Sequence, residues 1–316
     1  MASAQPPQLT PVQKQTLDVL GTTGAPRREF DPNLGRDLRS QLEAAMVEVL
    51  EDMNPTEVLF LSKHRLAQVH GCEVRFIAEE AAEGDFEATI PMVKGTVAHK
   101  AIELGIHWKG EPLPLELVDE AISSLTLSDS WVSDFLQTCS EADQATLRSE
   151  AGDKVHKFFE CFPPLKPVWR PATESSLSLE LAQGRVKMRG KVDLTLGAAT
   201  GNEARKVIID LKTGTPNPVH RDDLRFYALL DAIRVGIPPR LVASFYLDLG
   251  EARTEPVTVG LLETAVARTV DGIRRLTALR AGTTAPVHRP GPACRWCPIL
   301  ADCEPGRSWV AGNEER

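Results

Sequence analysis

Two short stretches decide the fold of this chain: Gly190-Lys191-Val192-Asp193-Leu194 and Val207-Ile208-Ile209-Asp210-Leu211-Lys212. The first belongs to a segment in which charged and apolar residues alternate, as in a half-buried strand. The second is an apolar run that ends in polar residues, which is typical of a buried strand. A period of two puts Asp210 and Lys212 on one side. If the two strands are neighbours, Asp193 and Asp210 lie together and can bind one hard cation such as Mg²⁺.

The sequence around these strands predicts an α/β protein. Asp31-Pro32 is typical of a helix start, and apolar residues then recur every four positions from Leu34 to Leu50. Gly282 is placed to end a long helix. Further helices are expected over Pro11–Leu20, from a turn at Lys94–Glu103, over Asp222–Val235 and over Leu261–Leu279, and a further strand over Leu241–Leu249.

The composition is that of a globular protein. The chain has 316 residues, of which 42% are hydrophobic and 25% charged, and this length predicts two domains or one core with large insertions. No stretch reaches the roughly 18 apolar residues of a membrane helix, so we expect no membrane partner and a cytoplasmic location. We expect an N-terminal extension over 1–55, a core over 56–285 with an acidic helical insertion at about 101–170, and a cysteine-rich segment over 286–316 that packs back on the region of residue 72.

Charge is distributed unevenly along the chain. The formal net charge is −8, so a nucleic acid would have to be held by a local basic surface. Residues 181–230 contain nine basic and five acidic residues, whereas residues 101–170 contain six basic and 12 acidic ones. The candidate nucleic-acid-binding residues are therefore Arg185, Lys187, Arg189, Lys191 and Arg225.

Three of the six cysteines form the tight cluster Cys294-x2-Cys297-x5-Cys303. In a reducing compartment such spacing favours a metal site over disulfides. Tetrahedral zinc and four-iron clusters each need a fourth ligand, for which Cys72 and His288 are the candidates. We expect Cys139 and Cys161 to be buried bystanders, because free cysteine usually packs as a small hydrophobic residue.

Four motifs in order resemble the RecB-like branch of the PD-(D/E)XK nuclease superfamily: Gly95–His99, Gly190–Leu194, Ile209–Gly214 and Asp223–Tyr227. The cysteine tail is similar to the iron-sulfur staple of AddB-type nucleases and CRISPR-associated RecB-like exonucleases. In those proteins the first ligand lies upstream of the nuclease motifs, and Cys72, after a similar opening segment, fits that position.

The resemblance implies a restriction-endonuclease-like fold, in which a mixed central sheet is flanked by helices, here with a helical insertion and an iron-sulfur-stapled C-terminus. It also implies that His99, Asp193, Asp210 and the carbonyl of Leu211 bind Mg²⁺ or Mn²⁺. Lys212 would be the catalytic lysine and Tyr227 a supporting or DNA-contacting residue. Asp223 departs from the family's usual Gln, which puts DNA positioning by that helix in doubt. A [4Fe-4S] cluster, with Zn²⁺ as the alternative, would be bound by Cys72, Cys294, Cys297 and Cys303.

The functional prediction is a metal-dependent deoxyribonuclease that hydrolyses phosphodiester bonds, of an exonuclease-like type with single-stranded DNA favoured. The alternative is a non-catalytic DNA-binding or assembly subunit that retains the fold and the staple. A zinc-stapled protein with no nucleic-acid role is a third possibility. Since the sequence has no Gly-x4-Gly-Lys-Ser/Thr loop, any unwinding would come from a partner, such as a helicase or another repair or defence subunit.

Overall fold

The computed structural model describes residues 8–21, 27–51, 53–54, 56–82, 88–111, 113–128 and 130–313. A mixed sheet with the strand order β1-β3-β4-β5-β6 lies at its centre, and β2 pairs with β3 outside this path. Pairs β1·β3 and β4·β5 are parallel, and pairs β2·β3, β3·β4 and β5·β6 are antiparallel. The strands are β1 (Leu59–Leu61), β2 (Ala172–Leu181), β3 (Val186–Leu196), β4 (Val207–Lys212), β5 (Leu241–Tyr246) and β6 (Glu251–Pro256).

The long strand β3 creates a fork in the sheet. One of its edges pairs with β2 along nearly its whole length, from Val186 to Thr195. Its other edge is shared, because β1 pairs with Val186–Met188 and β4 pairs with Leu194–Leu196. The stretch 189–193 between them has no strand partner on that edge. Polar side chains can therefore enter the sheet at this fork, and Asp193 lies at its border.

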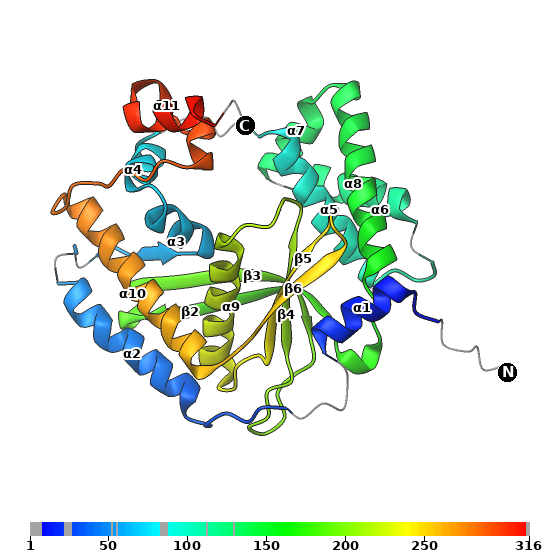
Figure 1. The fold of residues 1–316 in the computed structure, drawn as a ribbon, viewed down its shortest axis with the longest axis horizontal. Coiled ribbons are helices and arrows are strands. Elements are labelled where there is room, and N and C mark those ends of the chain that lie inside the picture. Colours follow the sequence, from blue (N-terminus) through cyan, green and yellow to red (C-terminus); the bar gives the residue numbers. More distant parts are fainter. Residues whose placement is uncertain are drawn as a thin grey trace.

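Helices cover both faces of the sheet (Figure 1). One apolar core joins α2, α3, α9 and α10 to the sheet, and a second joins α1, α5, α6, α7 and α8 to its other face. The described helices are α1 (Pro11–Leu20), α2 (Leu34–Val49), α3 (Lys63–His70), α4 (Glu73–Ala81), α5 (Ile90–Ile106), α6 (Pro114–Thr126), α7 (Trp131–Thr138), α8 (Glu141–Cys161), α9 (Val219–Val235), α10 (Val259–Ala281) and α11 (Glu304–Ala311). None of these helices is both long and apolar enough to cross a membrane.

The predicted fold class is confirmed as a mixed α/β protein whose central mixed sheet is flanked by helices. The expected helix over Pro11–Leu20 forms with those bounds, and Gly282 ends α10 with a left-handed backbone at φ 67°. Helix α9 begins at Val219, three residues before the expected start. The domain boundaries stay a prediction.

Two local expectations are wrong, and strands β2 and β6 were not expected. The turn expected at Lys94–Glu103 lies inside α5, because Thr89 and Pro91 start that helix earlier. The strand expected over Leu241–Leu249 ends at Tyr246, and a turn leads from it into β6, which the sequence reading missed. Strand β2 was not expected either, although Ser176 to Leu181 alternate between exposed and buried positions as a half-buried strand does.

Gly190 allows β3 to pack closely against α9. A Cβ atom at this position would lie 2.6 Å from Cε1 of Tyr227, which is far inside van der Waals contact. The glycine in the Gly190–Leu194 stretch is therefore needed for the close approach of the Tyr227 ring to the strand.

Replacing Gly190 with Ala should therefore destabilise the protein. Overpacking of this kind typically costs about 1–3 kcal/mol in unfolding free energy, which chemical denaturation would measure. Gly214→Ala is the matched control, because a Cβ there meets no atom within 4 Å. Equal stability of the two variants would contradict the close approach of Tyr227.

Candidate active site and the cysteine-lined cavity

The candidate active site is built around the buried carboxylate of Asp210, which is only 2% exposed. Lys212, two residues later on β4, places its Nζ 2.7 Å from Asp210 Oδ2. Lys63, the first residue of α3, donates to Asp210 Oδ1 at 2.8 Å. Two ammonium groups thus contact one carboxylate, where the sequence alone indicated only Lys212.

Asp223 supplies the second carboxylate of the group. Its Oδ2 accepts a hydrogen bond from Lys212 Nζ at 3.0 Å and lies 3.8 Å from Lys63 Nζ. We call Lys63, Asp210, Lys212 and Asp223 the charge cluster. Tyr227, one turn further along α9, lies beneath it, with Lys63 Nζ 4.7 Å from the centre of its ring. The departure from the family's Gln therefore adds a charge inside the site.

Burial and charge fix the protonation of these groups. Burial alone would raise the pKa of Asp210, but the ammonium groups of Lys63 and Lys212 lower it below its usual range. Burial alone would lower the pKa of Lys63, but the nearby carboxylate of Asp210 outweighs this effect, and the net pKa is raised. Burial raises the pKa of Tyr227 to about 12. Asp210 is thus ionised at neutral pH, Lys63 is protonated, and Tyr227 is uncharged.

Asp193 and His99 lie beside this cluster at the fork. The pairing of β3 with β4 ends at Leu194 and Ile209, and beyond it the carboxylate Oδ2 of Asp193 accepts a hydrogen bond from the backbone N–H of Leu211 at 2.6 Å. The other oxygen lies 3.3 Å from Nδ1 of His99 on α5. Burial lowers the pKa of His99, but the carboxylate of Asp193 outweighs it, and the net pKa is raised.

The donor chemistry of the site fits a hard divalent cation, although the side chains are paired with one another. Among the described residues, no group of three or more His, Cys, Asp or Glu side chains is arranged to hold a metal ion. Both oxygens of the buried Asp210 carboxylate are in contact with ammonium groups, Oδ2 with Lys212 and Oδ1 with Lys63. Carboxylate oxygens are nevertheless the ligand type that Mg²⁺ prefers in proteins. Metal binding would therefore require ion-pair partners to be exchanged at Asp210 and Asp193.

The predicted nucleic-acid-binding residues are mostly engaged in ion pairs. Lys187 lies 3.3 Å from Glu180, Lys191 pairs with Glu174, and Arg225 lies 2.6 Å from Glu255. The guanidinium of Arg185 donates to the backbone carbonyls of Met53 and Asn54. Arg189 instead lies 5.6 Å from the ring centre of Phe60, which is 51% exposed.

A second site is formed where α4 meets the C-terminal segment. Cys72, Cys294, Cys297, Cys303 and His288 line one cavity of about 420 Å³. Backbone N–H groups donate to sulfur at two of the cysteines, from Arg289 to Cys72 at 3.5 Å and from Gly291 to Cys294 at 3.3 Å. His288 Nδ1 lies 3.7 Å from Cys303 Sγ.

All six cysteines are free thiols. Cys139 and Cys161 do not line this cavity. Cys161 is buried, as expected, but Cys139 is partly exposed, because it follows the last residue of α7.

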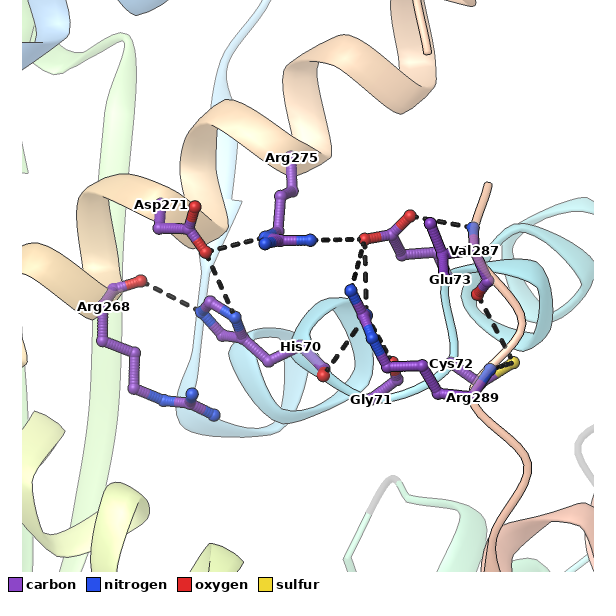
Figure 2. Close-up of polar contacts among 9 residues, drawn as sticks. All are labelled: His70, Gly71, Cys72, Glu73, Arg268, Asp271, Arg275, Val287 and Arg289. Atoms are coloured by element: carbon purple, nitrogen blue, oxygen red, sulfur yellow. Dashed lines mark hydrogen bonds and ion pairs between the residues drawn. The ribbon is translucent and has the colours of Figure 1, made fainter. Parts of the chain in front are cut away.

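The buried carboxylate of Glu73, at the start of α4, joins that helix to α10 and to the chain after it, beside this cavity (Figure 2). It is 4% exposed. Its oxygens accept hydrogen bonds from the backbone N–H of Val287 at 3.0 Å and from Arg275 at 2.8 Å. Arg289 lies 3.4 Å from the same carboxylate and also donates to the carbonyl of Gly71 at 2.8 Å. These contacts hold the chain after α10 against Cys72.

Comparison with known proteins identifies the class. A model of the PD-(D/E)XK nuclease superfamily matches residues 61–304, and the chain belongs to that superfamily. Its members are nucleases that act on DNA and generally use divalent metals such as Mg²⁺. No curated protein matches the chain.

Two solved structures resemble the chain distantly. A candidate exonuclease from Eubacterium rectale is 12% identical with a TM-score of 0.49, over 79% of this chain and 87% of that one. The protein SSO0001 is 14% identical with a TM-score of 0.34, over 85% of this chain and 96% of its own. Likenesses at this level carry no argument about function.

The charge cluster predicts that Lys63 and Asp223 are energetically coupled. In a double-mutant cycle of Lys63→Met and Asp223→Asn, we expect a coupling energy of about 0.5–3 kcal/mol, as for other residues in one ion-pair network. Urea unfolding of the four proteins would measure it. The exposed pair Arg39–Glu43, at 3.3 Å, is the control and should couple more weakly. If the effects of Lys63→Met and Asp223→Asn on the free energy of unfolding are strictly additive, the predicted coupling is wrong.

Proposed function

We propose that this protein is a divalent-metal-dependent DNA nuclease whose active site is the fork between β3 and β4. The observation that supports the proposal most directly is the meeting of Asp193, Asp210 and Lys212 with His99 around an ionised, buried carboxylate. Asp193, Asp210, His99 and the carbonyl of Leu211 would hold Mg²⁺ or Mn²⁺. When bound, such an ion polarises a phosphate oxygen and lowers the pKa of its water.

The chain's own residues would position the reacting groups. Lys212 lies between Asp210 and Asp223, so its ammonium is held at a fixed place. From there it would orient the attacking water and offset negative charge that builds on the phosphate. Lys63 and the uncharged Tyr227 would keep Asp210 in position. Hydrolysis would leave a 5′-phosphate and a 3′-hydroxyl.

The substrate we propose is single-stranded DNA, cleaved in an exonuclease-like manner. Arg189 and the exposed ring of Phe60 lie beside the unpaired edge of β3 that leads to Asp193. An aromatic ring paired with a guanidinium is suited to stacking on unpaired bases and contacting their backbone. The pairs of Lys187 and Lys191 would exchange their carboxylate partners for phosphate. The protein would work in the cytoplasm, with unwinding supplied by a helicase or another repair or defence subunit.

We further propose that Cys72, Cys294, Cys297 and Cys303 bind a [4Fe-4S] cluster with a structural role. Support comes from their shared cavity and from the two N–H donors directed at sulfur. A cluster there would close a loop of more than two hundred residues, which removes much entropy from the unfolded chain. Zn²⁺ is the alternative occupant, and the position of His288 beside Cys303 favours it.

The nuclease proposal predicts Mn²⁺-dependent degradation of single-stranded DNA by the purified protein. Asp210→Ala and Lys212→Met should each lower the rate by about 10²-fold or more, as expected when a charge-stabilising group is lost. Lys109→Gln, an exposed change, should leave it unchanged. An inactive wild type that still binds DNA would favour the non-catalytic alternative, and full activity of Asp210→Ala would rule out this site.

The cysteine proposal predicts about four iron and four sulfide per chain after anaerobic purification. Cys297→Ser should lose most of the iron, whereas Cys139→Ser, outside the cavity, should retain it. One zinc and no iron in the wild type would exclude the cluster.

A further inference from the structure

A cavity of about 870 Å³ lies at the opposite end of β4 from the candidate active site. It is bounded by α1, by the loop between α8 and β2, and by the residues that lead into β4 and β5. Val207 lines it, whereas Lys212 at the other end of the strand belongs to the charge cluster. Five residue-to-residue steps along the strand separate them by roughly 16 Å. The cavity is therefore distinct from the nuclease site.

The wall of this cavity is strongly basic on a chain of net charge −8. Glu203 is the single carboxylate among the described lining residues, and it pairs with Arg205 at 2.7 Å. The wall therefore carries a net charge of +4. A concentration of positive charge from segments far apart in the sequence attracts anions against the field of the whole molecule. Its basic residues are Arg27, Lys166, Arg170, Arg205 and Arg240.

Among the basic residues of the wall, Arg240 gives the strongest indication of an anion site. Its Nη2 donates to the backbone carbonyls of Leu20 and Gly21, at 2.5 and 3.3 Å. Among the described residues, no carboxylate forms an ion pair with it. Burial and then the charge of Arg27 lower the pKa of Arg240 to about 10. The guanidinium of Arg240 thus stays charged at neutral pH, although it is partly desolvated and close to the charge of Arg27. A bound anion would reduce the repulsion between these two charges.

The cavity also offers a surface for a planar ring. Trp169 lies in its wall, half-buried, with the ammonium of Lys166 at 5.6 Å from the ring centre. Leu17, Leu196 and Val207 add apolar surface. Cationic groups around an indole are suited to a ligand that combines phosphate with an aromatic base.

We propose that this cavity binds a nucleotide, with its phosphate held by the basic wall and its base against Trp169. The site is independent of the proposed catalysis. The same chemistry is offered by a free mononucleotide and by the 5′-phosphorylated end of a DNA strand. In either case the ligand occupies a second site, at the opposite end of β4 from the reacting phosphate.

The test is calorimetric titration of the full-length protein, without added divalent metal, with dAMP, deoxyadenosine and inorganic phosphate. We expect dAMP to bind and deoxyadenosine not to bind. Because Lys166 and Arg170 are exposed, the double variant Lys166→Gln/Arg170→Gln should fold normally and bind dAMP at least tenfold more weakly. Lys109→Gln is the matched control and should bind like the wild type. Trp169→Leu should weaken dAMP binding but leave phosphate binding unchanged.

The active-site variant Asp210→Ala separates the two proposals. This variant should lose DNA cleavage but bind dAMP as the wild type does. The dAMP titration therefore tests the nucleotide cavity even if the nuclease proposal is wrong. A 5′-phosphorylated oligonucleotide that binds more tightly than dAMP, and loses this advantage in the Lys166→Gln/Arg170→Gln variant, would assign the site to a strand end. Oligonucleotide binding that the double variant does not change would assign the site to free nucleotides. No binding of either phosphate-bearing probe, or equal binding by the wild type and the double variant, would overturn the proposal.

Discussion

The ion pairs around Asp210 are the constraint on which the site depends. A carboxylate that is 2% exposed is costly to bury unless cations and hydrogen bonds replace its water. Here the cations come from α3 and β4, and a second carboxylate from α9 balances them. Two helices, α3 and α9, must therefore dock beside β4 in one arrangement for the charges to cancel. The fork left by β1 and β4 along β3 is where the sheet has room for them.

Sequence periodicity predicted the strands of the site but not all of its members. Alternation around Asp193 and the apolar run before Asp210 are local properties, so β3 and β4 could be found from the residues alone. Lys63 was missed because its role depends on tertiary packing. The available signal was a polar residue directly after a short apolar stretch and a helix-capping Ser62. Asp223 was noted only as a departure from a family pattern, because its two lysine partners are not neighbours in the sequence.

Counting charge along the sequence gave a poor guide to the basic surface. The window that contains β3 is net positive, yet Lys187 and Lys191 pair with carboxylates of the neighbouring strand β2. Arg225 of α9 likewise pairs with Glu255 of β6. Pairs between strands cannot be seen in a window of consecutive residues. The strongly basic wall at the other end of β4 instead collects side chains from several separate segments, none of which is basic enough by itself to attract notice.

The contacts of Glu73 have a consequence for the order of folding and metal binding. Its contacts with Val287, Arg275 and Arg289 involve only protein atoms, so the chain after α10 is docked beside Cys72 in the apoprotein. The docking of this segment therefore does not depend on a bound metal group. If the proposed cluster binds there, its insertion would follow the folding of this segment, and its loss would leave the anchoring contacts of Glu73 in place.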